Sequence, residues 1–365
     1  MKSQPNVSAP KNPDAELRFQ FASDNTAGVC PEAWEAMAAA NEGFDASYGE
    51  DRHTLEASNL FRELFEIDCD VYFVFNGTAA NSLALASLCR PYHSIVCHET
   101  AHVETDECGA PAFFSNGAKL LAATGAHGKL DLSEVERIVA ARNDVHAPKA
   151  RAITLTQSTE SGTVYRIDEI RALRELADRH SMHIHMDGAR FANAVASSAH
   201  SGQVSPKALT WQAGVDVLCF GGTKNGMAIG EAVVFFNRSL AAEFEFRCKQ
   251  SGQLASKMRY QAAPWVAMLK GGNDGLWLRY GRQANSLARR LGSTLQQIQG
   301  VRLQHAVEAN GVFATMPDSY HAALERRGWH YYRFSGAARF MCSWKTTDAD
   351  VDALVKDLTE IADAR

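Results

Sequence analysis

The stretch VYFVFNGTAANSLALASLC, residues 71–89, is the clearest local sign of the fold. Aromatic and β-branched residues predict a strand over 71–75, and the turn Asn76-Gly77-Thr78 leads into a predicted helix over 79–89. Similar units follow, with strands predicted at 94–97, 152–156, 183–186, 215–220 and 232–236 and helices at 132–142 and 167–180. This alternation predicts an α/β fold with a mainly parallel sheet and helices on both of its faces.

The two ends of the chain follow other patterns. Residues 1–16 are polar and rich in Pro and Asn, and helices are predicted at 31–41 and 53–65. Beyond about residue 240 the chain has predicted helices at 244–268, 285–299 and 349–364 and strands at 301–305, 311–315 and 338–344. We therefore expect a polar arm over 1–20, a large domain over 21–250 and a smaller C-terminal α/β domain over 251–365.

The composition is that of an ordinary globular protein, with 46% hydrophobic and 22% charged residues among 365. The net charge of -5 and the scattered Lys and Arg residues argue against a nucleic-acid partner. Apolar runs stay well short of the roughly 20 residues that a membrane span needs, and the N-terminus does not resemble a signal peptide, so we expect a cytoplasmic protein. The eight cysteines form no C-x-x-C pair, which favours reduced, buried thiols.

Ligands of open parallel sheets gather outside the carboxyl ends of the strands. One such end is VDVLCFGGTKNGMAIG, residues 215–230, where a strand runs into a turn of small residues that holds Lys224. Glycines there would let a flat ring approach, and a partly desolvated lysine amine becomes nucleophilic. Lys224 is therefore a candidate Schiff-base lysine, although a lysine in an ordinary surface turn also fits. The glycine spacing of a Walker loop is absent.

A second strand end carries HIHMDGAR, residues 183–190. Asp187 could pair with a pyridinium nitrogen and keep it protonated, and Arg190 could reach a ring hydroxyl or a substrate carboxylate. A rival interpretation exists, because His183, His185 and Asp187 alternate along one strand face and are possible metal ligands. His185 also fits a buried histidine with a structural role.

Two further strand ends carry weaker signals. The turn Asn76-Gly77-Thr78 opens a helix, so its N–H groups could cradle a phosphate or simply form a helix cap. His102 follows the strand at 94–97 and could stack on a cofactor ring, transfer protons or be structural. Each signal is ambiguous alone. Their order along the chain resembles that in the large domain of fold-type-I pyridoxal-phosphate enzymes.

More closely, the chain resembles the low-specificity L-threonine aldolases, including bacterial phenylserine aldolases. The resemblance runs from about Phe21 to the C-terminus, and HMDGAR and GGTKNGMAIGEA are its most specific parts. It implies that Lys224 holds pyridoxal phosphate and that Asp187 pairs with the ring nitrogen. His102 then stacks on the ring, Arg190 neighbours the ring and the substrate carboxylate, and the phosphate is held at Asn76, Gly77 and Thr78.

The resemblance also implies a set of residues around the substrate. Ser23 and Arg339 match positions that hold its carboxylate, and the planar fork of arginine suits that task. His146 matches a second histidine near the substrate hydroxyl. Surface residues that would act at or across a subunit interface are Tyr48, near the site, and Lys249 with Lys257 or Arg259, near a neighbouring subunit's phosphate.

Two departures from the family pattern concern the aldehyde end of the site. This chain has Gln157-Ser-Thr-Glu160 where many relatives have Glu-Asn-Thr-His, and Asp106 where many have an aromatic residue. Both changes leave the preferred substrate side chain and the threo/erythro preference open.

By this resemblance we expect pyridoxal-phosphate-dependent cleavage of L-threonine, L-allo-threonine and related β-hydroxy-α-amino acids, phenylserine among them, to glycine and an aldehyde. His102 or His146 would take the hydroxyl proton, and the enzyme would be a homotetramer without a catalytic metal. Alternatives within the same fold are a β-eliminating lyase and an aminotransferase. More distant alternatives are a metallohydrolase built on residues 183–187 and a non-catalytic pyridoxal-binding regulator.

Overall fold

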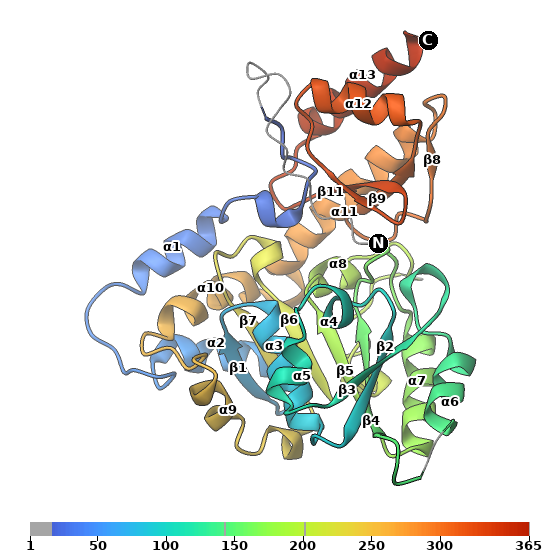
Figure 1. Ribbon diagram of the computed structural model, residues 1–365. Helices are drawn as coiled ribbons and strands as arrows, with labels where there is room; N and C mark the ends of the chain where they lie inside the picture. Colours follow the sequence, from blue (N-terminus) through green and yellow to red (C-terminus); the bar gives the residue numbers. More distant parts are fainter. Residues whose placement is uncertain (1–16, 142–143, 201, 365) are drawn as a thin grey trace.

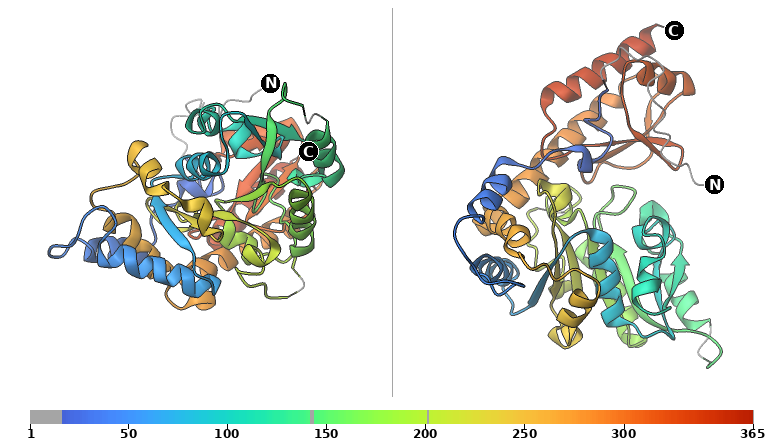
Figure 2. Two further views of the ribbon diagram at one scale, coloured as in Figure 1. Left: turned by 90° about the horizontal axis from the view of Figure 1, so that it is seen from below. Right: turned by 60° about the vertical axis from the view of Figure 1, so that its left-hand side comes forward.

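The computed structural model describes residues 17–141, 144–200 and 202–364, so most of the predicted polar arm lies outside the described residues. The chain forms a large α/β unit and a small unit that contains the C-terminus (Figure 1). A second view shows the small unit standing over one edge of the large sheet (Figure 2, right).

The large unit contains a seven-stranded sheet in the order β1-β7-β6-β5-β4-β2-β3. Strand β7 runs antiparallel to both of its neighbours, and the remaining pairs are parallel. The predicted α/β fold with a mainly parallel sheet is confirmed. The strands are β1 (Asp70–Val74), β2 (His93–His98), β3 (Lys119–Ala123), β4 (Lys149–Thr156), β5 (His183–Gly188), β6 (Val217–Gly221) and β7 (Glu231–Phe235).

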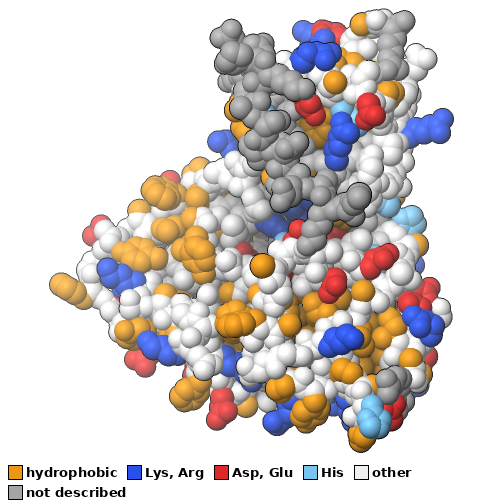
Figure 3. Space-filling model, viewed as in Figure 1, with side chains coloured by type: hydrophobic (Ala, Val, Ile, Leu, Met, Phe, Trp, Pro, Cys, Tyr) orange, Lys and Arg blue, Asp and Glu red, His pale blue; other side chains and the backbone are white. Residues whose placement is uncertain are grey.

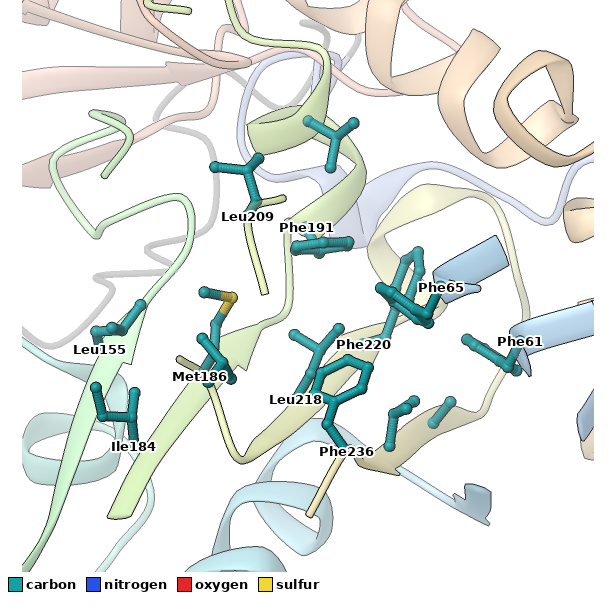
Figure 4. Packing of buried hydrophobic residues seen from close by; sticks show 14 of the residues in the cluster. Phe61, Phe65, Leu155, Ile184, Met186, Phe191, Leu209, Leu218, Phe220 and Phe236 are labelled. Carbon is teal, nitrogen blue, oxygen red and sulfur yellow. The ribbon is translucent and has the colours of Figure 1, made fainter. Parts of the chain in front are cut away.

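Helices cover both faces of this sheet, because its strands present apolar side chains on both sides. Along β6, Leu218 and Phe220 enter the core under α2, α7 and α10, whereas Val217 and Cys219 enter the core under α3 and α9. Figure 4 shows the aromatic part of the first core. The helices are α1 (Pro31–Ala39), α2 (Arg52–Phe65), α3 (Gly77–Leu88), α4 (His102–Thr105), α5 (Ala110–Phe114), α6 (Leu132–Ala140), α7 (Ile167–Arg179), α8 (Phe191–Val195), α9 (Phe244–Gln250) and α10 (Arg259–Leu269).

The small unit packs three helices on a four-stranded antiparallel sheet in the order β10-β11-β9-β8. Phe21, near the start of the described chain, is buried in its core. The elements are α11 (Leu276–Leu295), β8 (Arg302–Leu303), β9 (Gly311–Thr315), α12 (Asp318–Arg326), β10 (Tyr332–Phe334), β11 (Ala337–Met341) and α13 (Asp348–Asp363).

Two features differ from the sequence predictions. Strand β3 was not predicted, and the helix expected over 244–268 is two helices, α9 and α10. Trp265 and Met268 of α10 belong to the core of the large unit, and α11 then passes from that core into the core of the small unit. Residues beyond 250 therefore contribute to the core of the large unit, and the domain bounds at residue 250 stay a prediction. A helical pattern predicts a helix but does not tell against which core it packs.

Two further findings concern the cysteines and the helices. All eight cysteines are free thiols, and each except Cys108 is buried. Within the described part of the chain, no helix is long and apolar enough to span a membrane.

Candidate active site

Loops at one edge of the large sheet collect the candidate site residues. This edge carries the carboxyl ends of the parallel strands, and α8, which begins soon after β5, lies there on the side that faces the small unit (Figure 1). Lys224 follows β6, His102 follows β2, and Asp187 is near the end of β5. The parallel register therefore brings together residues that are far apart in the sequence.

Asp187 is buried and held by two donors. Its Oδ2 accepts a hydrogen bond from Asn81 Nδ2 at 2.9 Å, and its Oδ1 accepts one from the backbone N–H of Ala189 at 3.0 Å. Asn81 lies on α3 and was not predicted as a site residue. These two bonds fix the orientation of the carboxylate, so Asp187 can present it to a ring nitrogen.

His102 is the first residue of α4 and is half-buried. Its Nδ1 lies 2.9 Å from Oε1 of Glu107, whose carboxyl group is fully buried. The hydrogen bond to Glu107 raises the pKa of His102, while burial opposes that rise. The unbonded Nε2 of His102 is the ring atom left for a ligand or a proton.

Lys224 lies in the short turn Thr223–Asn225, which packs against the turn Asp24–Thr26. We predicted that glycines here let a flat ring approach the backbone. At Gly221 and Gly222, protein atoms instead occupy the space that a side chain would need. A Cβ on Gly221 would lie 2.4 Å from the Ala189 carbonyl oxygen, and one on Gly222 would lie 2.7 Å from the Gly230 carbonyl oxygen. These glycines therefore set the position of the lysine turn against the end of β5.

A buried carboxyl group lies behind this turn. Glu231, at the start of β7, accepts a hydrogen bond from the backbone N–H of Gly222 at 2.7 Å. Burial raises the pKa of Glu231 to about 7, although the charge of Lys224 works in the opposite direction. Glu231 belongs to the family-specific stretch quoted above, but nothing in the local pattern indicated that it would lie beneath the lysine turn.

Arg190 is paired within the chain. Its Nε and Nη2 donate to the two oxygens of Asp24 at 2.7 and 3.0 Å, and the two side chains are 9% and 1% exposed. Burial raises the pKa of Asp24, but the charges of Arg190 and Lys224 outweigh it and lower the pKa to about 2. Asp24 occupies the Nε–Nη2 edge of the guanidinium and leaves the Nη1 protons for another acceptor, so the predicted contact of Arg190 with the cofactor ring or the substrate carboxylate stays a prediction.

The sequence prediction named Ser23 as a site residue but did not include its neighbour Asp24. The Ser23 hydroxyl is buried and caps the turn by accepting from the backbone N–H of Asn25 at 3.2 Å. Asp24 also accepts a hydrogen bond from Asn310 of the small unit at 3.2 Å. The sequence signal that could have identified Asp24 is its acidic side chain directly after Ser23, a predicted substrate ligand.

Arg339, in β11 of the small unit, has the opposite character to Arg190. Its Nε is buried without a hydrogen-bond partner among the described residues, and its guanidinium lies 5.2 Å from the Tyr332 ring centroid. Burial and the nearby charge of Arg190 lower the pKa of Arg339. A buried donor without an acceptor is costly, so this guanidinium is suited to bind an anion.

The start of α3 offers a second anion site. Asn76 Oδ1 accepts from the backbone N–H of Ala79 at 2.9 Å, so Asn76 is the N-cap of a 12-residue helix. The N–H groups of Gly77 and Thr78 have no partner within the helix, since the first turn of any helix lacks acceptors. A Cβ placed on Gly77 would meet no atom within 4 Å. The helix start is therefore open to a phosphate.

Three of the residues predicted to act at a subunit interface lie close to one another. Lys249 Nζ lies 4.4 Å from the centroid of the Tyr48 ring, and the Tyr48 N–H donates to the Ser256 carbonyl at 3.1 Å, next to Lys257. Tyr48, Lys249 and Lys257 are all exposed. Arg259 instead donates to the Ala40 carbonyl at 3.0 Å. Their role at a subunit interface stays a prediction.

The structure does not bring His146 to the site. This exposed residue lies just before β4 and therefore at the amino end of that strand, the opposite edge of the sheet. His127 lies at the correct edge, soon after β3, and its carbonyl accepts from the Thr163 hydroxyl at 2.6 Å. Sequence reasoning missed His127 because it missed β3.

Two residues that depart from the family pattern have different surroundings. Glu160 is partly buried in the turn closed by the Thr159 N–H to Thr163 carbonyl hydrogen bond. Its negative charge contributes to raising the pKa of His102, so it lies within electrostatic range of that ring. Asp106 is exposed and accepts a hydrogen bond from the Thr105 hydroxyl at 2.6 Å.

The metal-site alternative does not match the geometry. His185 is fully buried, with Nδ1 2.7 Å from the Thr154 hydroxyl and Nε2 3.2 Å from the Cys219 sulfur. Burial lowers its pKa to about 4. His183 instead lies 3.8 Å from Asp216. Within the described ranges, no three His, Cys, Asp or Glu side chains are arranged to hold a metal ion.

A lysine, a fixed carboxylate and an open helix start around one sheet edge suit the amine-reactive carbonyl, the ring nitrogen and the phosphate of pyridoxal phosphate. Together with the sheet, they define a fold-type-I pyridoxal-phosphate enzyme. Comparisons with solved structures support this class. Leishmania major threonine aldolase is 26% identical with a TM-score of 0.87 over 94% of this chain and 99% of that one. A putative L-allo-threonine aldolase from Listeria monocytogenes, 15% identical, has a TM-score of 0.67 over 92% and 95% of the two chains.

Sequence relatives narrow the class. The beta-eliminating lyase family model matches residues 20–319. A low specificity L-threonine aldolase of Pseudomonas aeruginosa is 57% identical, over 93% of this chain and 96% of that protein. Another from a Pseudomonas species is 55% identical, over 94% and 98% of the two chains. The chain belongs to the low-specificity L-threonine aldolases of the beta-eliminating lyase family, which depend on pyridoxal phosphate.

Proposed function

We propose that this protein cleaves L-threonine, L-allo-threonine and related β-hydroxy-α-amino acids to glycine and an aldehyde. One observation carries the proposal: the Nε of Arg339 is buried without a hydrogen-bond partner among the described residues, and the charges of Arg190, Asp24 and Glu160 at the candidate site act on its guanidinium. The names of the relatives support the reaction. L-phenylserine, with a bulkier side chain, is a further proposed substrate.

Each residue has a distinct task in this proposal. Pyridoxal phosphate, when bound, supplies an electron sink for the pair left at Cα as the Cα–Cβ bond breaks. Lys224 holds it covalently, Asp187 binds its ring nitrogen, and the N–H groups at the start of α3 bind its phosphate. Arg339 binds the substrate carboxylate and so orients the bond that breaks. The Asp24–Arg190 pair supports this arrangement by holding the lysine turn between the two units.

The reaction also needs an acceptor for the β-hydroxyl proton. His102 Nε2 is available for that proton, because Nδ1 is already bonded to Glu107. His127 is the second histidine at this edge and takes the place that the sequence prediction gave to His146. Glu160, whose charge acts on His102, would contact the substrate side chain.

Product analysis tests the proposal. The purified protein with pyridoxal phosphate should convert L-threonine and L-allo-threonine into glycine and acetaldehyde, and L-phenylserine into glycine and benzaldehyde. Formation of ammonia and a keto acid would instead indicate a β-eliminating lyase. Turnover that requires an amino acceptor would indicate an aminotransferase. Either result would overturn the aldolase proposal while leaving the fold and the cofactor intact.

A lysine substitution tests the cofactor link. Lys224→Ala should abolish the visible absorption band of the bound cofactor together with aldehyde release. Lys270→Ala, at an exposed position after α10, is the matched control and should keep both. A Lys224→Ala variant with full activity would contradict the assignment.

We further propose that the protein is a cytoplasmic homo-oligomer and that an exposed apolar surface forms the contact between its subunits. Large apolar side chains are exposed on and near α1 and α2, where hydrophobic atoms gather at the left of Figure 3. They include Phe44, Trp34 and Leu55, and Tyr48 is close by in the sequence. Monomeric proteins rarely leave such patches uncovered, so this surface suits a second copy of the chain.

A further inference from the structure

Glu107 has no role in the functions assigned so far, yet its carboxyl group is buried beneath the candidate site. It lies between α4 and α5, and its side chain is wholly inaccessible to solvent. Burying a carboxylate is costly unless donors compensate for the lost water. Two donors lie close to its Oε1: Asn81 Nδ2 at 2.9 Å and His102 Nδ1 at 2.9 Å.

Asn81 determines the polarity of this cluster. Its amide nitrogen lies 2.9 Å from both Glu107 Oε1 and Asp187 Oδ2. An amide NH₂ group has two protons and can donate one to each carboxylate, whereas the flipped amide would place its oxygen against two acceptors. Glu107 Oε1 therefore accepts from Asn81, and the ionised carboxylate accepts from His102 as well; burial raises the pKa of Glu107, whereas its hydrogen bonds with His102 and Asn81 act to lower it.

The tautomer of His102 follows from that polarity. Because Glu107 Oε1 accepts, the 2.9 Å contact to His102 requires a proton on Nδ1. In the neutral ring the lone pair is then on Nε2. A Glu–His pair of this kind works like the Asp–His pair of serine proteases, in which the carboxylate orients the imidazole.

We infer that Glu107 is a positioning residue that fixes the Nδ1–H tautomer of His102 and, through Asn81, couples it to Asp187. The inference rests on the proposed function in one respect, that Nε2 of His102 faces the reacting atoms. Three carboxyl groups act on this imidazole, namely Glu107, Asp187 and Glu160, and together they favour its protonated form. Burial of the ring acts against them.

Glutamine at position 107 would disturb this arrangement in either orientation. If its amide NH₂ faced His102, Nδ1 would become an acceptor and the proton would move to Nε2. If its oxygen faced His102, the NH₂ would replace Oε2, which is buried without a partner among the described residues. Both outcomes remove the negative charge that stabilises the imidazolium. Glu104→Gln is the matched control, because it removes an exposed carboxylate from the same short helix.

The direct test is a pH titration of the imidazole nitrogens of His102 by NMR in the full-length, cofactor-loaded enzyme labelled at histidine. His102→Gln identifies the signals. The wild-type ring should be protonated at Nδ1 when neutral. Glu107→Gln should weaken that preference and lower the pKa of His102, whereas Glu104→Gln should change neither. A neutral wild-type ring protonated at Nε2 would overturn the inference without any need for a variant to fold.

Kinetics provide the second measurement. Glu107→Gln should lower kcat for L-threonine about a hundredfold, as expected for a misoriented acid-base group, with little change in KM. The acidic limb of its pH profile should move to lower pH, because His102 acts as a base in its neutral form and its pKa falls. An unchanged profile would contradict the inference. Failure to release any aldehyde from wild-type enzyme would instead refute the proposed function, while the NMR result would still decide the tautomer.

Discussion

Two arginines of the site differ in what surrounds them. Arg190 is neutralised by Asp24 through two hydrogen bonds, whereas the Nε of Arg339 is buried without a partner in the described structure. Each of the two side chains carries one positive charge, and the sequence analysis predicted that both contact the substrate carboxylate. The neighbours show that Arg190 already binds one carboxylate, whereas the Nε of Arg339 lacks an acceptor among the described residues.

Arg339→Lys should raise KM for L-threonine about thirtyfold, because an ammonium group cannot form the paired bonds of a guanidinium and a charged hydrogen bond contributes about 2 kcal/mol. Arg302→Lys, at an exposed position in β8, should leave KM unchanged. Steady-state kinetics with both variants check this. An unaltered KM for Arg339→Lys would move the carboxylate site elsewhere.

The buried Asp24 should make the fold sensitive to acid. Its pKa is lowered from 3.8 to about 2 in the folded chain, so its contribution to stability is present above 3.8 and is lost as pH falls through about 2. The loss amounts to about 2 kcal/mol. Urea unfolding between pH 5 and about 2 should show it, and Asp24→Asn should remove that part of the pH dependence. Asp352→Asn, in an exposed ion pair, should not.

Two histidines lie at opposite edges of the large sheet. His127 follows β3 at the carboxyl edge, and His146 precedes β4 at the amino edge. Strand β3 escaped the prediction because its alternating pattern is short, and KLLAA at 119–123 contains none of the β-branched residues found in the other strands of the large sheet.

We therefore expect His127→Ala to lower kcat/KM for L-threonine at least about tenfold, in keeping with the loss of a hydrogen bond to the substrate hydroxyl. His146→Ala should stay within about twofold of wild type, as exposed substitutions usually do. Parallel kinetic measurements on the two variants decide the matter. The reverse order of effects would restore His146.

The close packing of the lysine turn against the end of β5 gives a second prediction for the elements. Gly221→Ala would push a methyl group into the Ala189 backbone, 2.4 Å from its carbonyl oxygen. Overpacking of this kind should cost about 2 kcal/mol and displace Lys224, with weaker cofactor absorbance. Gly28→Ala, where an added Cβ meets no atom within 4 Å, should be harmless. Thermal unfolding and the visible spectrum measure both effects.

At the scale of the whole molecule, the small unit and the N-terminal segment complete a site built on the large sheet. Arg339 and Asn310 come from the small unit, and Asp24 lies in the segment that enters both units. Surface residues Tyr48 and Lys249 lie near exposed apolar side chains, as expected of a site shared between subunits.

Disrupting that apolar surface should separate the subunits. The Phe44 side chain is fully exposed and that of Trp34 is 61% exposed. A Trp34→Asp, Phe44→Asp double variant should elute as a smaller species in light-scattering chromatography, because charges oppose burial of the interface. Val145→Asp, equally exposed at the amino edge of the sheet, is the control. An unchanged mass for the double variant would place the interface elsewhere.

The sequence by itself determined six of the seven strands of the large sheet, all but β3, and the edge at which the chemistry lies. Alternating strands and helices require parallel pairing, and parallel pairing places Lys224, Asp187 and His102 at the ends of their strands on one side. Tertiary structure alone decided the partners: Asp24 with Arg190, 166 positions apart, and Asn81 with Asp187, 106 positions apart. Local patterns report on neighbours along the chain, whereas the charge and tautomer of a site residue depend on side chains that only folding brings within hydrogen-bond distance.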